Sequence, residues 1–250
     1  MLSLSKLGRI PIRLHRPLEG TPKTVTISRE ADGWYAYLSC AGVPVHALLE
    51  TGQETGIDLG LASFATLADG ALIHNPRCYR TAEQRLKRLQ HCVSRRKKGS
   101  NRRRKAVKLL AKAHQTVRRQ RQDFHHKAAL QLVRQHDTIS YEALQTANML
   151  RNHSLAKSIS DAGWSAFLAI LAFKAAYAGK RAVAVPPAYT SQTCSGYGRE
   201  VWKGLSVRWH ECPYEDCNVR LHRDHNAALN ILALGKNPRS GAGQAPQAPT

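Results

Sequence analysis

The first fifty residues consist of short apolar runs separated by turn-forming residues. β-Branched and aromatic side chains are concentrated at residues 9–14, 24–28 and 34–40. Proline-containing sequence and the Asp32-Gly33 pair separate these runs. Short runs of this kind, bounded by breakers, predict three β-strands within residues 1–50.

Residues 54–70 predict the central strand of a sheet, with a hairpin beside it. Ile57 and Leu59 flank Asp58, and a second β-prone run ends at Asp69-Gly70, before a further apolar run. An Asp-Gly pair favours a tight two-residue turn because it accepts positive φ angles. A carboxylate on a buried strand costs free energy unless it is paired or binds a metal. Asp58 is therefore either a metal ligand or a turn-capping residue at a strand end.

The rest of the chain alternates between helical and strand patterns, which predicts an α/β fold. Apolar positions keep helical spacing through residues 80–135 and break at Gly99-Ser100, so this region should form two antiparallel helices. A broad apolar stripe predicts one helix over residues 158–179, buried against the sheet. The remaining elements expected are strands at residues 137–142 and 181–186 and an amphipathic helix that begins at Asp224.

Three acidic residues stand at the edges of these elements, far apart in the sequence. Asp58 lies on the first strand of the sheet, Glu142 ends the strand at residues 137–142, and Asp224 begins the last helix. If the elements bring them together, three carboxylates suit a site for two hard divalent cations about 3.5–4 Å apart. We expect Mg²⁺ or Mn²⁺ there, in a phosphodiester-cleaving site.

The charge of the chain indicates a polyanionic partner. Lys and Arg number 38 against 17 Asp and Glu, which gives a net charge of +21. Residues 80–134 hold nineteen of these basic residues and only two acidic ones. Charge this dense favours nucleic-acid phosphates over a merely solvated helix face or a ribosomal-type basic protein. The nucleic-acid-binding residues expected at the tip of the helical pair are Arg95, Arg96, Lys97, Lys98, Arg102, Arg103, Arg104 and Lys105.

The cysteines indicate a metal site rather than disulfides. No membrane span and no signal-peptide core are recognisable, so we expect a cytoplasmic, nucleoid-associated protein, in which thiols stay reduced. Cys194, Cys212 and Cys217 fall within 24 residues, whereas Cys40, Cys78 and Cys92 show no ligand spacing. Three cysteines can hold Zn²⁺ when a fourth ligand completes the tetrahedron. His210, His222 and a water molecule are the candidates for that position.

Four blocks of sequence resemble the TnpB/OrfB proteins of insertion sequences, which are relatives of type V CRISPR effectors. The blocks are GIDLGL at residues 56–61, YEAL at 141–144, TSQTCS at 190–195 and HRDHNAALNIL at 222–232. The resemblance implies an RNase H-like (RuvC) nuclease domain at residues 51–190 and 220–235, which includes the basic helical hairpin at residues 80–135. It also implies a partial wedge-type β-barrel at residues 1–50 and a zinc ribbon at 191–219. Residues 236–250 should form a disordered tail.

The resemblance assigns roles as well. It makes Asp58, Glu142 and Asp224 the Mg²⁺-binding catalytic residues, and Cys194, Cys212 and Cys217 zinc ligands. The family pattern has cysteine where Tyr197 stands, so zinc binding should be weakened. The implied function is RNA-guided DNA cleavage, with a guide RNA from the transposon end, by a transposase-type protein shortened at its N-terminus. The alternatives are a nucleic-acid-binding protein that does not cleave and an inactive transposon relic.

Overall fold

The computed structural model describes residues 1–204 and 206–237. The chain divides into two compact units. One unit comprises Met1–His46 and Arg85–Thr116, and the other comprises Ala47–Gln84 and Val117–Thr250. The boundary falls within two helices, α1 (Cys78–Ser94) and α2 (Asn101–Gln135). The expected break between these helices is confirmed, since α1 ends at Ser94 and Gly99 adopts a positive φ of 82° before α2 begins.

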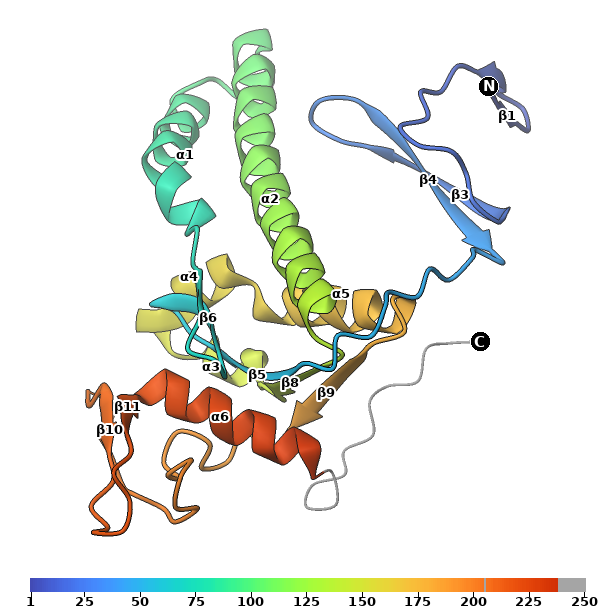
Figure 1. The fold of residues 1–250 in the computed structure, drawn as a ribbon. Coiled ribbons are helices and arrows are strands. Elements are labelled where there is room, and N and C mark those ends of the chain that lie inside the picture. Colours follow the sequence, from blue (N-terminus) through green and yellow to red (C-terminus); the bar gives the residue numbers. More distant parts are fainter. Residues whose placement is uncertain (205, 238–250) are drawn as a thin grey trace. The chain divides into compact units, whose positions relative to one another are not determined.

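The larger unit is built on a five-stranded mixed sheet (Figure 1). Its order is β7 (Leu72–His74), β6 (Ser63–Leu67), β5 (Glu54–Leu59), β8 (Thr138–Glu142) and β9 (Arg181–Val185). β5, β8 and β9 run parallel, whereas β6 and β7 pair antiparallel beside β5. The prediction that Asp58 lies on a central strand flanked by a hairpin is therefore confirmed.

The turn between β6 and β7 differs from the predicted two-residue turn. The Leu67 carbonyl accepts a hydrogen bond from Gly70 N at 2.9 Å, and Leu67 N donates to the Ala71 carbonyl at 2.9 Å. The loop therefore contains three residues, and only its glycine has a positive φ, of 84°. Asp69 instead accepts a hydrogen bond from Ala71 N at 2.9 Å, which is the side-chain turn typical of aspartate.

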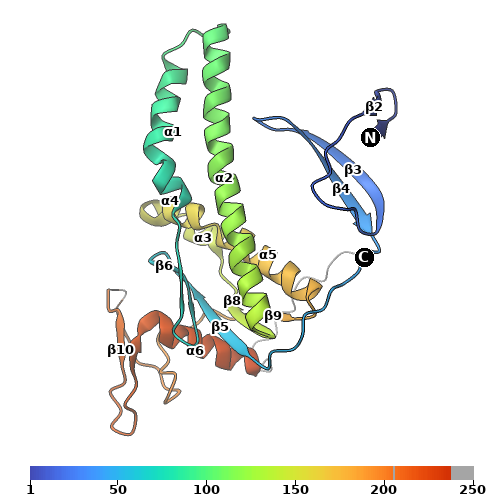
Figure 2. The same cartoon turned by 45° about the horizontal axis from the view of Figure 1, so that its top comes forward.

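Helices cover both faces of the sheet. α6 (Arg223–Lys236) lies along one face, and the C-terminal part of α2 together with α5 (Trp164–Tyr177) lies on the other (Figures 1 and 2). α6 approaches β5 and β8 closely at two glycines. A Cβ atom on Gly56 would lie 2.1 Å from the Ala228 carbonyl oxygen, and one on Gly235 would lie 1.8 Å from Ser140 Oγ. Side chains at these two positions would push α6 away from the sheet.

The main core fills the face opposite α6. Phe64 of β6 makes edge-to-face contacts with Phe124 of α2 at 4.8 Å and with Phe167 of α5 at 4.9 Å between ring centroids. Ile57 and Leu59 of β5 belong to the same cluster. Since side chains alternate along a strand, Gly56 and Asp58 belong to the α6 face.

The predicted single helix at residues 158–179 is wrong in one respect. The structure has two helices, α4 (His153–Ala162) and α5, which meet at Gly163 with φ 65°. A short helix, α3 (Thr146–Met149), precedes them. By length and composition, His153–Tyr177 is the one stretch of the described residues able to span a membrane. Its buried side chains, among them Ile159, Trp164 and Phe167, belong to the core of this unit, so we interpret it as core helix.

The smaller unit contains two separate two-stranded sheets. β1 (Leu2–Leu4) pairs with β2 (Gly8–Ile10), and β3 (Thr21–Arg29) pairs with β4 (Trp34–Ala41). The strand predicted at residues 9–14 ends at Ile10, because Pro11 follows and offers no backbone N–H for pairing. Its strands do not close into a barrel in the part of the chain that the structure describes. Gln115 of α2 donates hydrogen bonds to Glu30 Oε2 at 2.6 Å and to Asp32 Oδ1 at 2.7 Å.

A small antiparallel ribbon precedes α6. It is formed by β10 (Trp209–Glu211) and β11 (Arg220–His222), so its second strand lies just beyond the predicted ribbon boundary at residue 219. The predicted tail begins at Lys236, which is instead the last residue of α6. Residues 238–250 of that predicted tail lie outside the described residues.

Candidate metal centres

The sheet brings two of the three predicted carboxylates to the same edge. Asp58 is the penultimate residue of β5, and Glu142 is the last residue of β8. These parallel strands pair with Ile57 opposite Tyr141, so the residues that follow, Asp58 and Glu142, are neighbours in register. Asp224 lies in the first turn of α6, which packs on the face to which Asp58 belongs.

Electrostatics show that the three carboxylates interact. Burial, followed by the negative charges of Glu142 and Asp224, raises the pKa of Asp58 from 3.8 to about 8, and nearby Arg223 only partly opposes this. Burial also raises the pKa of Glu142, against the effect of a hydrogen bond from Thr190. Without a cation, the folded chain therefore resists placing full charge on all three groups. A divalent cation would relieve this repulsion.

The carboxylates are spaced more widely than the ligands of a closed metal site. In residues 1–204 and 206–237, the only group of three whose ligand atoms all lie within 4.8 Å of one another is a set of cysteines. The wider spacing of the acids suits ligands shared between two ions better than ligands gathered around one. An all-oxygen donor set matches Mg²⁺ or Mn²⁺ rather than softer metals.

Two residues hold the acidic site and were not predicted from the sequence. The Thr190 hydroxyl donates a hydrogen bond to Glu142 Oε1, and the Thr190 carbonyl accepts one from Asn230 Nδ2 at 2.8 Å. The Arg223 guanidinium donates to the Gly204 carbonyl and to Ser191 Oγ, both at 3.1 Å. Both residues lie inside the quoted sequence blocks at residues 190–195 and 222–232, but their type alone did not indicate these contacts.

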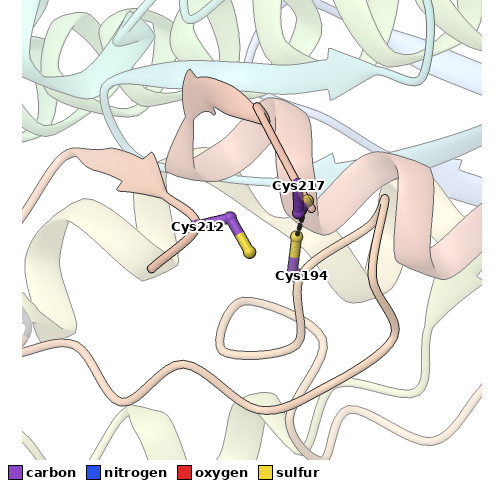
Figure 3. Close-up of side chains that lie close together, drawn as sticks. All are labelled: Cys194, Cys212 and Cys217. Atoms are coloured by element: carbon purple, nitrogen blue, oxygen red, sulfur yellow. Dashed lines mark hydrogen bonds between the residues drawn. The ribbon is translucent and has the colours of Figure 1, made fainter. Parts of the chain in front are cut away.

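The three predicted zinc ligands come together in the ribbon. Cys194, Cys212 and Cys217 converge from separate turns, and the sulfurs of Cys194 and Cys217 are 3.7 Å apart (Figure 3). The Gly198 N–H donates to the Cys194 carbonyl at 2.8 Å, which closes the first turn. Burial raises the pKa of the Cys194 thiol, but the backbone N–H groups of Tyr197 and Gly196 bring its pKa below the ordinary value. A thiol with a lowered pKa is suited to metal binding.

Tyr197 does not face the cysteines as a fourth ligand. Its ring stacks on Tyr214 at 4.7 Å between centroids, and the Arg199 guanidinium lies over both rings, at 5.3 and 5.5 Å. The remaining cysteines, Cys40, Cys78 and Cys92, do not belong to any such metal-ligand group among the described residues.

Comparison with known proteins agrees with this geometry. A family model described as "Probable transposase", of the OrfB family, matches residues 36–153, and one described as "Cas12f1-like, TNB domain" matches residues 164–231. A "Putative RNA-guided DNA endonuclease" of Streptomyces pristinaespiralis is 39% identical over 240 residues, which cover 94% of this chain and 59% of that protein. The chain belongs to the TnpB/OrfB family.

Other relatives of this TnpB/OrfB chain carry related names. The "Putative RNA-guided DNA endonuclease InsQ" of Escherichia coli K12 is 32% identical, over 93% of this chain and 61% of that protein. The "TnpB-like protein L79" of Acanthamoeba polyphaga mimivirus is 26% identical, over 89% of this chain and 45% of that protein. The chain thus spans about three fifths of the two bacterial relatives.

Solved structures support the fold of the TnpB/OrfB chain. The protein of a Cas12f1–sgRNA–target DNA complex matches 86% of this chain and 56% of its own, with a TM-score of 0.51 and 16% identity. The protein of a CRISPR-Cas12f ternary complex matches 83% of this chain and 44% of its own, with a TM-score of 0.54 and 20% identity. These similarities show a shared α/β fold, consistent with a RuvC-like nuclease.

The basic tip of the TnpB/OrfB hairpin is mostly exposed to solvent. Arg103 is the exception, because its guanidinium donates to the carbonyls of Val93 at 2.9 Å and Arg96 at 3.2 Å and so closes the interhelical turn. The predicted tip residues that are exposed are Arg95, Arg96, Lys97, Lys98, Arg102, Arg104 and Lys105. Arg103 is therefore tied to the backbone of its own turn, which the sequence did not indicate.

Proposed function

We propose that this chain carries the nuclease centre of an RNA-guided DNA endonuclease that hydrolyses phosphodiester bonds with Mg²⁺ or Mn²⁺. The observation that carries the proposal is the raised pKa of Asp58, about 8, which arises from burial together with the charges of Glu142 and Asp224. Three acids that repel one another at the end of a sheet are an arrangement that divalent cations stabilise. The relatives named as RNA-guided DNA endonucleases support the same interpretation.

Asp58, Glu142 and Asp224 would hold the ions, which when bound supply an activated water and stabilise the leaving oxygen. The chain's own residues prepare this site. The Thr190 hydroxyl fixes Glu142, and the hydrogen bonds from Arg223 to the Gly204 carbonyl and Ser191 Oγ keep its guanidinium near Asp58. A positively charged group held there would also attract the phosphate of a nucleic-acid strand.

The exposed cations of the hairpin tip would bind the nucleic-acid backbone. Lys and Arg on phosphates position a strand without reading its sequence, so a guide RNA would supply the specificity. We propose that this guide derives from the transposon end and that the partner DNA lies in the nucleoid. The charge of +21 on the whole chain supports a polyanionic partner.

The test is cleavage of labelled DNA and RNA strands by the purified chain, with and without its guide. We expect cutting that requires Mg²⁺ or Mn²⁺, is lost with EDTA and is abolished in Asp58→Asn, while nucleic-acid binding persists in that variant. Asp123→Asn, which removes an exposed carboxylate paired with Lys127, is the matched control and should cut normally.

The spacing of the carboxylates favours one second candidate, a nucleic-acid-binding protein that no longer cleaves. Their oxygens do not gather as closely as the cysteine sulfurs do. This candidate predicts binding with the same salt dependence but no cutting in Mn²⁺ with any guide. Metal-dependent cutting that Asp58→Asn removes would exclude it.

A further inference from the structure

The cysteine cluster lacks an obvious fourth ligand, and three polar side chains compete for that role. Tyr197 stands where the family pattern has a cysteine, but its ring is stacked on Tyr214 beneath Arg199. A phenol with a pKa near 10 is in any case a poor zinc ligand at neutral pH. The choice is then between the two histidines of the ribbon, His210 and His222.

His222 is already used elsewhere. Its Nδ1 accepts a hydrogen bond from Asp224 N at 3.4 Å, which caps the N-terminus of α6. Its ring is exposed and makes an edge-to-face contact with Trp209, at 6.1 Å between centroids. Binding to the cysteine cluster would cost α6 this cap, next to Asp224.

His210 has the opposite character. It is 0% exposed, and its Nε2 is a buried nitrogen with no hydrogen-bond partner. A buried imidazole nitrogen without a partner costs free energy, so such an atom requires an explanation. His210 also lies two residues before Cys212, and residues two apart in an extended strand project to the same side. The imidazole and the Cys212 thiol therefore emerge from the same side of the ribbon.

A buried ammonium group links His210 to the cysteines. Lys203 Nζ is hydrogen-bonded to His210 Nδ1, and the Lys203 side chain is itself buried. Burial and nearby Arg223 lower the pKa of Lys203, whereas the negative charges of Cys194 and Cys212 act to raise it. A cation thus lies between an imidazole nitrogen and two thiol groups. These are the donor types that Zn²⁺ takes in Cys₃His sites.

We infer that His210 is the fourth zinc ligand of this ribbon and replaces the cysteine that the family pattern has at the position of Tyr197. In this arrangement Zn²⁺ takes the place of the Lys203 ammonium among Cys194, Cys212, Cys217 and His210. His210 lies outside the 4.8 Å group of sulfurs, so its ring turns toward Cys212 when the metal binds. Lys203, on a chain segment outside helices and strands with four methylene groups, swings aside.

X-ray absorption on the zinc-loaded, otherwise unmodified chain tests this ligand set directly. We expect about three sulfur neighbours near 2.3 Å and one nitrogen near 2.0 Å, as in other Cys₃His sites. The imidazole ring adds outer-shell scattering that a water ligand does not produce. A spectrum without that scattering, or a chain that retains no zinc after gel filtration in the reduced state, overturns the inference.

Variants give a second test, by competition with a chromophoric zinc chelator. His210→Ala should weaken zinc binding by at least about tenfold, since even residues that only orient a ligand contribute 10–100-fold. His222→Asn, which keeps a side chain able to cap α6, should bind zinc as the unmodified chain does. Adding Tyr197→Cys to His210→Ala should restore tight binding through a fourth thiolate.

Unchanged zinc affinity in His210→Ala would refute the role of His210, as would an equal loss in His222→Asn. If His210→Ala does not fold, the X-ray absorption experiment on the unmodified chain decides the question. Neither test depends on nuclease activity. The outcome therefore stays separate from that of the proposed function.

Discussion

Neutralising Asp58 should stabilise the metal-free protein, and more strongly as the pH rises. In the unfolded chain this carboxyl ionises near its ordinary pKa of 3.8, whereas in the folded chain it keeps its proton up to about pH 8. Between these values the folded state binds one more proton than the unfolded state. The free energy of unfolding then falls by about 1.4 kcal/mol per pH unit on account of this group. Asp58→Asn removes the effect because asparagine does not ionise.

The same relation gives the size of the effect. Asp58→Asn should increase the free energy of unfolding by up to about 2 kcal/mol at pH 5 and about 4 kcal/mol at pH 7. These values are upper bounds, because Asp58 is partly accessible and water can relax around it. Below pH 4 the carboxyl is protonated in both states, and the variant and the unmodified chain should be equally stable in this respect.

Urea unfolding in EDTA, at intervals from pH 4 to 8, measures this difference. Asp123→Asn is the control, because that exposed carboxylate pairs with Lys127 at 2.7 Å and its removal should cost about 0.5 kcal/mol or less at every pH. Mg²⁺ should then stabilise the unmodified chain, since it binds only the folded state, and should stabilise Asp58→Asn much less. If the curves of Asp58→Asn and the unmodified chain run parallel from pH 4 to 8, Asp58 does not carry a raised pKa and the argument for a cation site fails.

Three further outcomes are expected. Neutralising the exposed tip cations should lower the slope of log affinity against log salt by about 0.7–0.9 for each phosphate that the tip no longer neutralises, and an unchanged slope would place the tip outside the interface. Gly56→Ala should destabilise the chain by about 1–3 kcal/mol or more in urea unfolding, because the added Cβ meets the Ala228 carbonyl at 2.1 Å. Gly33→Ala, with nothing within 4 Å, is its control. Thr190→Val should slow metal-dependent cleavage by about tenfold because it removes the hydrogen bond to Glu142, while Thr190→Ser, which keeps the hydroxyl, should retain most of the rate.

The elements that hold the candidate acidic site could be predicted because their signals are local. β5 and β8 are short β-prone runs next to turn residues, and α6 begins at an acidic residue followed by an apolar stripe. The break in the helical hairpin at Gly99 was recognisable because polar and basic residues surround it. These signals depend only on neighbours within a few residues.

The features that were mispredicted depend on distant parts of the chain. Gly163 divides one apolar stretch into α4 and α5, but a single glycine is often tolerated within a helix. Its positive φ is favoured here by packing, since a Cβ at Gly163 would lie 3.2 Å from His125 Cε1 of α2. His125 in turn binds the Ala162 carbonyl at 2.8 Å and so holds the end of α4. No local pattern reports an interaction between residues so far apart in the sequence.

The acidic site itself connects both kinds of information. Gly56 and Asp58 occupy the same face of β5, and the glycine lets the α6 backbone approach that face to a distance no side chain would allow. Because Asp224 lies in the first turn of α6, this close approach is what brings its charge to bear on Asp58. The position of each carboxylate along the sequence was predictable, but their convergence is a consequence of helix packing on the sheet. A glycine two residues before an acidic strand residue is therefore part of the site, although it carries no chemical group.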